Sequence, residues 1–221
     1  MSITSLIIGE SGTGKSTSIE NLDPKETFII NVLDKPLPFR GYKNNYKNIS
    51  GWDDKEGNYF SSDDHQRILR CIKMVNEDRI EIKNLIIDDW QYTMCNEFMR
   101  RAMEKGFNKF TEIGKNAWSM IQTLVGCRND LFSFVLSHNS VDESGMSKTK
   151  TIGKMLDNIV NIEGMFTIVF HTKIIDGNYF FLTQNDGFHM AKSPKGMFKD
   201  KYINNDLFLS KKNIIDYFNN N

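Results

Sequence analysis

The eight residues from Gly9 to Ser16 have the types and spacing of a phosphate-binding P-loop, GESGTGKS. Glycines let the backbone curl so that successive N–H groups face phosphate oxygens. Lys15 would place its charge on the β- and γ-phosphates, and Ser16 would offer its hydroxyl to Mg²⁺. The sequence therefore predicts a nucleoside triphosphate site with this set of residues: Gly9, Glu10, Ser11, Gly12, Thr13, Gly14, Lys15, Ser16 and Thr17.

The segments on either side of this Gly9–Ser16 loop favour the same interpretation. Residues 3–8 are mostly apolar and β-prone, which is typical of a buried strand. Residues 16–21 can begin a helix, whose N-terminal dipole would face the bound anion. A Gly- and Ser-rich turn that matches the pattern by chance would lack this strand before it and helix after it.

A second chemical candidate is Asp88, at the end of the apolar segment 83–89. In an open parallel sheet, ligands bind at the carboxyl ends of the strands. A carboxylate there can hold Mg²⁺ opposite Ser16. The alternative is that Asp88 caps a helix that starts near Trp90.

Asp89 follows directly and could polarise the water that attacks a γ-phosphate, although it too could be a helix cap. Asp34 is its rival, because it ends a predicted strand at 27–33. Pro36 and Pro38 prevent that strand from continuing. The residues alone leave the choice between Asp89 and Asp34 open.

A fourth buried strand is predicted at 131–136, and the polar residues Ser137, His138 and Asn139 follow it. His138 could contact the γ-phosphate and report its loss, or could simply be part of a polar strand exit. The basic segment 140–154 is expected to be a mobile loop. Its lysines could contact DNA phosphates or a neighbouring subunit's nucleotide, or be merely solvated; they are Lys148, Lys150 and Lys154.

The remaining pattern predicts one α/β domain over residues 1–221, with a core at about 3–200 and a tail at 201–221. We expect a surface excursion at 39–61, then a helix capped by Ser61, Ser62 or Asp63, and further helices near 92–103 and 112–129. Asp176-Gly177-Asn178 lies between two β-prone segments, so the last third should turn to antiparallel β structure.

Composition excludes several classes of protein. Lys and Arg total 28 and Asp and Glu total 28, so no global basic field indicates nucleic-acid binding. No apolar run approaches the roughly 20 residues that cross a bilayer, and a strand predicted directly after Met1 leaves no room for a signal peptide. The three cysteines are far apart, which favours free thiols in the cytoplasm over a metal site.

Several motifs together resemble a known family: the Gly9–Ser16 loop, IIDDWQY, FVLSHN, KTKTIGKMLDN, IEGMFTIVF and AKSPKGMF. They are similar to phage-encoded AAA/RecA-like P-loop ATPases of the kind that includes the Sak-class single-strand annealing proteins. The resemblance implies a RecA-like, mainly parallel sheet that binds ATP and Mg²⁺, through Gly14, Lys15, Ser16 and Asp88, with His138 as a sensor. It also implies action on single-stranded DNA in phage recombination or replication, beside a single-strand-binding protein. The chain departs from the pattern in lacking a Glu after Asp88.

The predicted reaction is hydrolysis of ATP to ADP and phosphate, with Lys15 stabilising charge and Asp89 or Asp34 orienting water. No arginine finger is evident within the chain, so a homo-oligomer could complete the site. A nucleotide kinase is an alternative, but residues 140–160 contain no arginine for the lid that such enzymes need. An ATP-dependent loader of the replication machinery is the other alternative.

Overall fold

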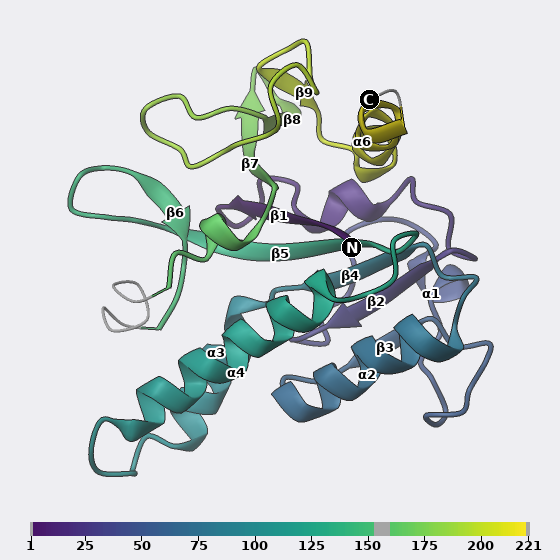
Figure 1. The fold of residues 1–221 in the computed structure, drawn as a ribbon, viewed down its shortest axis with the longest axis vertical. Helices are drawn as coiled ribbons and strands as arrows, with labels where there is room; N and C mark the ends of the chain where they lie inside the picture. The colour runs from purple at the N-terminus through teal and green to yellow at the C-terminus, as the bar shows by residue number, and fades with distance from the viewer. Residues whose placement is uncertain (1, 153–159, 220–221) are drawn as a thin grey trace.

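The computed structural model describes residues 2–152 and 160–219, which form an α/β fold around one long sheet (Figure 1). The strand order is β3-β2-β4-β5-β1-β7-β8-β9, with β6 paired to an extension of β5. Strands β1 to β5 and β7 pair in parallel, whereas β8, β9 and β6 pair antiparallel. The bounds are β1 Ile3–Gly9, β2 Thr27–Asn31, β3 Tyr59–Ser61, β4 Asn84–Asp88, β5 Phe132–Val141, β6 Ser147–Thr149, β7 Ile168–Ile175, β8 Asn178–Leu182 and β9 Tyr202–Asn204. The mainly parallel sheet and the antiparallel addition are confirmed.

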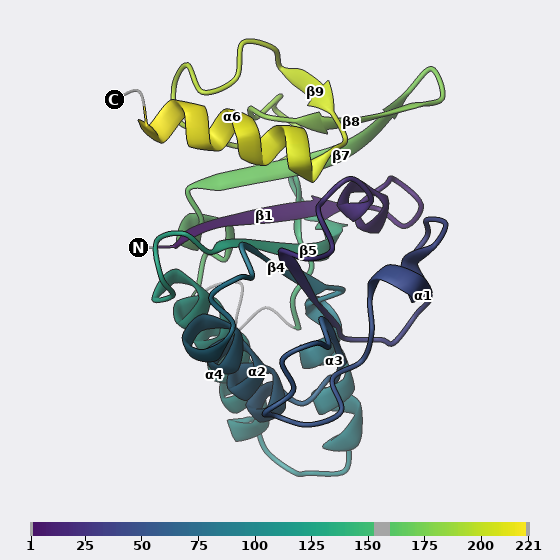
Figure 2. The ribbon, with the colours of Figure 1, turned by 90° about the vertical axis from the view of Figure 1, so that its right-hand side faces the viewer.

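Helices cover both faces of this sheet, which explains why its strands are nearly continuous apolar runs. Helices α2, α3 and α4 pack on one face, and η1 and α6 pack on the other (Figure 2). Successive residues of β1 alternate between the two cores: Leu6 and Ile8 face the first, and Ile7 faces the second. The helices are η1 Ser16–Ile19, α1 Tyr42–Asn45, α2 His65–Asp78, α3 Gln91–Arg100, α4 Asn108–Val125, η2 Glu163–Met165 and α6 Leu207–Asn219.

The register of the parallel strands brings the candidate residues to one edge. Gly9 at the end of β1 pairs with His138 of β5, and Asn31 of β2 pairs with Asp88 of β4. Strand β5 lies between β1 and β4, so His138 is placed between the Gly9–Ser16 loop and Asp88. The carboxyl edge of the sheet is thus where the polar strand ends meet.

The helix expected at 16–21 is wrong in kind, because η1 is a single 3-10 turn of 4 residues. Ser18 donates its hydroxyl to the Lys15 carbonyl (2.5 Å), which competes with helical hydrogen bonding. Pro24 follows shortly, and the chain must return to begin β2 at Thr27. A helix dipole therefore adds nothing at this loop.

The segment at 39–61 is more than a surface excursion, because it contains helix α1 and contributes strand β3 at the sheet edge. Tyr59 and Phe60 are buried. The Asn58 amide fixes the approach by donating to the carbonyls of Pro24 and Asn45. The sequence shows no period here because β3 is only 3 residues long.

The predicted loop at 140–154 is also wrong over its described part. Strand β5 continues past His138 to Val141 and forms an antiparallel hairpin with β6. Asp142 holds the turn by accepting from the backbone N–H groups of Ser144 and Met146. Residues 153 and 154 lie outside the described residues.

The predicted tail at 201–221 is instead part of the folded domain over its described residues. Strand β9 extends the sheet, and helix α6 lies over the second core (Figure 2), with Leu207 and Ile214 fully buried. The other helices lie within a few residues of expectation, but Asp64, and not one of the three predicted residues, caps α2 through the Arg67 N–H. No helix in residues 2–152 or 160–219 has the length and apolarity that a bilayer crossing requires.

Candidate functional site

A cavity of about 450 Å³ opens at the carboxyl edge of the sheet, beside β1. This carboxyl-edge cavity is lined by Ser11, Gly12, Gly14, Lys15, Ser16 and Thr17 from the loop, and by Lys35, Pro38, Asp89, His138 and Tyr179 from other segments. Its volume lies in the range of small-molecule sites. Six of the nine loop residues predicted to bind nucleotide line it, while Gly9, Glu10 and Thr13 do not.

Gly9 and Thr13 shape the loop from behind. A Cβ on Gly9 would lie 1.8 Å from the Thr172 hydroxyl of β7, so only glycine fits there. The hydroxyls of Thr13 and Thr172 are 2.5 Å apart, and Thr13 also donates to the Glu10 carbonyl (2.7 Å). These contacts fix the loop to β7.

Lys15 is 6% exposed and folds back across the loop. Its Nζ donates to the carbonyls of Gly9 (2.8 Å) and Glu10 (2.7 Å). Burial lowers the pKa of Lys15 to about 8, against the opposing charges of Asp89 and Asp88. The group keeps most of its charge at neutral pH and is held by weak neutral acceptors that an anion could replace.

Ser16 and Asp88 meet as predicted. The Ser16 hydroxyl donates to the Asp88 carboxylate with an Oγ–Oδ1 distance of 2.9 Å, and Asp88 is 4% exposed. Burial, followed by the neighbouring charge of Asp89, raises the pKa of Asp88 to about 6. A hydroxyl and a poorly solvated carboxylate are oxygen donors that suit Mg²⁺, whose charge would favour the ionised form.

Asp89 is buried at the cavity wall with a left-handed backbone (φ 62°), which Asp tolerates better than most residues. Its carboxylate accepts from Lys35 Nζ (2.5 Å) and lies 3.4 Å from His138 Nε2. Burial alone would raise the pKa of Asp89, but the hydrogen bonds from His138 and Lys35 outweigh it and hold that pKa below its ordinary value. Asp89 is therefore ionised across the physiological range.

The helix-cap alternative for Asp88 and Asp89 is wrong. Helix α3 begins at Gln91, and its N-cap residue, Trp90, makes no side-chain cap hydrogen bond. The left-handed turn at Asp89 directs its carboxylate to Lys35 and His138 instead.

His138 lies within β5 rather than at its end, at the point where the strand leaves β1. Its backbone N–H donates to Gln91 Oε1 (3.0 Å), and its ring meets the Tyr92 ring edge-to-face at 6.0 Å. Two residues of α3 thus set the position of the imidazole next to Asp89.

Asp34 does not join the cavity. Its carboxylate accepts from the Tyr59 hydroxyl (3.3 Å), and it is absent from the lining. The next residue, Lys35, occupies that place, and sequence reasoning missed it. Asp34 takes a left-handed turn (φ 54°) between β2 and two prolines, which brings Lys35 rather than Asp34 to the cavity, and no sequence pattern identifies this turn in advance.

Two of the lysines considered for DNA or subunit contacts, Lys148 and Lys150, do not line this cavity. Lys148 is on β6, 3.8 Å from Asp142, and the Lys150 backbone N–H donates to the His138 carbonyl (2.8 Å). Lys154 is outside the described residues. The AKSPKGMF segment makes a turn, in which the Met197 N–H donates to the Pro194 carbonyl and Phe198 packs against Phe170.

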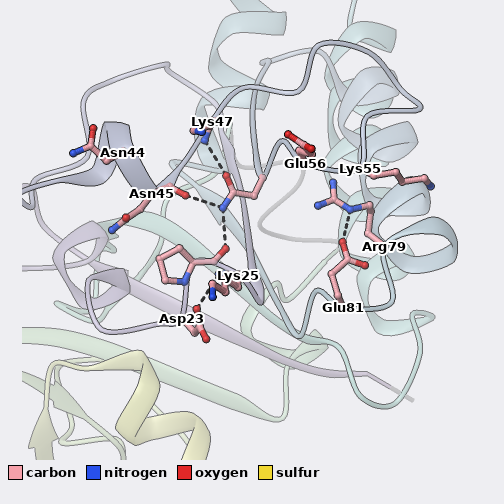
Figure 3. Close-up of a pocket in the computed structure, with 11 residues that line it drawn as sticks. Asp23, Lys25, Asn44, Asn45, Lys47, Lys55, Glu56, Arg79 and Glu81 are labelled. Carbon is pink, nitrogen blue, oxygen red and sulfur yellow. Dashed lines mark hydrogen bonds and ion pairs between the residues drawn. The ribbon is translucent and has the colours of Figure 1, made fainter.

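A second hollow of about 530 Å³ lies at the opposite edge of the sheet, at the amino ends of β2, β3 and β4 (Figure 3). This amino-edge hollow is lined by Asp23, Pro24, Lys25, Asn44, Asn45, Lys47, Lys55, Glu56, Asn58, Arg79 and Glu81. The Asn58 amide bonds to the surrounding backbone, and Arg79 bonds to Glu81 and the Gly57 carbonyl. Its buried polar groups thus serve the chain itself.

Neither a scan against models of protein families nor a search of curated proteins found a match to the chain.

Proposed function

We propose that the carboxyl-edge cavity binds ATP with Mg²⁺ and hydrolyses it to ADP and phosphate. The observation that carries this proposal is the 2.9 Å contact between Ser16 and Asp88, residues 72 apart in the chain, with Lys15 directly beside it. A hydroxyl, a buried carboxylate and a buried lysine around one glycine-rich loop are the groups that a Mg²⁺-bound triphosphate requires.

The charged and hydroxyl side chains at and beside the cavity have separate roles in this reaction. Lys15 exchanges its two carbonyl partners for β- and γ-phosphate oxygens, which are stronger acceptors because they are charged. Ser16 and Asp88 hold Mg²⁺, which neutralises developing phosphate charge when bound. The loop backbone supplies N–H groups to the phosphates.

Asp89 orients the attacking water rather than removing its proton early. Its lowered pKa makes it a weak base, and phosphoryl transfer needs little help from a base in its loose transition state. His138 and Lys35 fix the carboxylate, and His138 is close enough to respond to γ-phosphate loss through the Asp89 contact. Because Asp34 bonds Tyr59 away from the cavity, we assign the water-orienting role to Asp89.

The cellular process is proposed from the sequence resemblance. We infer a RecA-like phage ATPase that acts in the cytoplasm of a bacterial host on single-stranded DNA, beside a single-strand-binding or replication protein. No arginine lines the carboxyl-edge cavity in the described part of the chain, so a neighbouring copy in an ATP- or DNA-dependent homo-oligomer would supply the missing positive charge.

The test is the rate of phosphate release with and without single-stranded DNA, measured beside the molecular mass in the presence of ATP. We expect slow hydrolysis by the isolated chain, stimulation by DNA that falls with salt, and a larger assembly with ATP. Hydrolysis without any response to DNA would remove the recombination role and favour the loader. A phosphorylated nucleoside or nucleotide among the products would identify a kinase instead.

A further inference from the structure

One wall of the carboxyl-edge cavity has no part in the reaction proposed above. It is formed by Tyr179 at the start of β8, across the cavity from the group formed by Asp89 and His138. The β7–β8 hairpin turns at Asp176 and Gly177 beyond the carboxyl edge, which places Tyr179 opposite Ile174 of β7. Tyr179 is 46% exposed and is the only Phe, Tyr or Trp among the lining residues that the structure describes.

The Tyr179 ring lies directly against the loop. Gly14 has a left-handed backbone (φ 93°), and a Cβ on Gly14 would lie 2.8 Å from Tyr179 Cδ1. A side chain at residue 14 would therefore push the ring away, and glycine lets the ring and the loop share one continuous wall. One edge of the ring is thus fixed while nearly half of the residue faces solvent.

Asn205, just after β9, lies at the same place. Its side-chain Oδ1 and Nδ2 are 3.1 and 3.2 Å from the position of a Gly14 Cβ, and its backbone N–H donates to the Tyr179 carbonyl (3.2 Å). Both amide atoms are buried without a hydrogen-bond partner among the described residues. Such unpaired buried groups are costly, which distinguishes this amide from the satisfied Asn58 amide of the amino-edge hollow.

The two ends of the cavity therefore offer different chemistry. The end with Lys15 and Asp89 is charged and suits phosphate and metal, whereas the Tyr179 end offers an aromatic face. A nucleoside has the matching part, because a base stacks on an aromatic ring.

We propose that Tyr179 forms the nucleoside subsite of the cavity by stacking on the base, with Asn205 holding Tyr179 from behind through the hydrogen bond of its backbone N–H. This inference rests on the proposed function, since it assumes that the phosphates lie on the Gly9–Ser16 loop. It makes the C-terminal β8–β9 addition part of ligand recognition, and it predicts selection for a nucleoside triphosphate over inorganic triphosphate.

The test compares Mg²⁺-ATP with Mg²⁺-tripolyphosphate by calorimetry on the full chain. We expect the wild type to bind ATP more tightly than tripolyphosphate, and Tyr179→Ala to weaken ATP binding about tenfold while leaving tripolyphosphate binding unchanged. Tyr179→Phe should retain ATP affinity because the stacking face remains. Tyr202→Ala, at an exposed tyrosine of β9 outside the cavity, is the matched control and should match the wild type.

Each other outcome is decisive. Equal loss of both ligands in Tyr179→Ala, or no loss of either, would overturn the subsite while leaving the phosphate site in place. Equal affinity of the wild type for ATP and tripolyphosphate would overturn it too. If the wild type binds neither ligand, the proposed function fails and the subsite fails with it.

Discussion

The two edges of the sheet carry hollows of similar size but opposite character. The amino-edge hollow is the larger, at about 530 Å³ against 450 Å³, and it is rich in charged side chains. Its buried members are held by nearby backbone and ion-pair partners, as Arg79 is by the Gly57 carbonyl and Glu81. At the carboxyl edge, the buried charges of Lys15, Asp88 and Asp89 interact with one another, and Lys15 and Asp89 line the cavity.

The volume of a hollow therefore does not identify it as a ligand-binding site. A fold stabilises its own loops with buried polar groups that are fully paired, and these groups need no ligand. Two adjacent buried carboxylates and a lysine on neutral carbonyls are costly for the isolated chain, and perturbed groups of this kind cluster where a ligand is to be bound. Variants at the carboxyl edge can therefore be compared with matched variants at the amino edge.

The largest expected effect comes from Lys15→Ala. Removing the charge that stabilises the transferred phosphate should lower the rate of ATP hydrolysis on the order of 1000-fold, as measured by phosphate release. The matched control is Lys25→Ala, a lysine of the amino-edge hollow, which should hydrolyse ATP at the wild-type rate. Similar rates for Lys15→Ala and the wild type would remove the mechanism.

The next effect separates the two candidate acids. Asp89→Asn should lower the hydrolysis rate on the order of 100-fold, because a neutral amide orients water poorly and loses its pairing with Lys35. Asp34→Asn keeps an acceptor for the Tyr59 hydroxyl and should leave the rate unchanged. The reverse pattern would return the role to Asp34.

A smaller effect concerns stability at the Mg²⁺ position. The pKa of Asp88 is raised from 3.8 to about 6 in the fold, so its ionisation opposes folding as pH rises through that range. Without Mg²⁺, Asp88→Asn should therefore raise the free energy of unfolding at pH 7.5 by about 3 kcal/mol, and by only about 0.5 kcal/mol at pH 4. Denaturant titrations at both pH values measure this, with Glu56→Gln at the amino edge as the neutral control. A loss of stability at pH 7.5 would contradict the account.

The smallest effect concerns Lys35. Its hydrogen bond helps to hold the pKa of Asp89 down, so Lys35→Ala should move the acid limb of the pH–rate profile toward higher pH. Lys35 is half exposed, so water screens the pair and stability should change little. Lys47→Ala, at the amino edge, should leave the profile in place. A profile that does not move would mean that Asp89 is not the group whose ionisation the rate reports.

Much of the carboxyl edge could be predicted from sequence because its signals are local. The Gly9–Ser16 loop is contiguous, and Asp88 and His138 each follow a run of apolar residues long enough to read as a strand. Parallel strands bring their carboxyl ends together, so strand order alone places these residues near one another. The hairpin at Asp176–Asn178 was likewise encoded in its turn residues.

What could not be predicted depends on contacts between distant segments. Lys35 joins Asp89 only because a left-handed turn at Asp34 changes which side chain faces the cavity. Tyr179 and Asn205 reach Gly14 through the pairing of β7, β8 and β9, which no local pattern specifies. The helix after the loop was overestimated, because propensity does not show how soon the chain must return to β2.

The central claim is that the carboxyl-edge cavity, and not the larger amino-edge hollow, binds the nucleotide. Calorimetric titration of Mg²⁺-ATP into the wild type, Lys15→Ala and Lys25→Ala tests it most directly. The account predicts one ATP per wild-type chain, the same affinity in Lys25→Ala, and an affinity at least about 100-fold weaker in Lys15→Ala. Unchanged binding in Lys15→Ala, or loss of binding in Lys25→Ala, would contradict it.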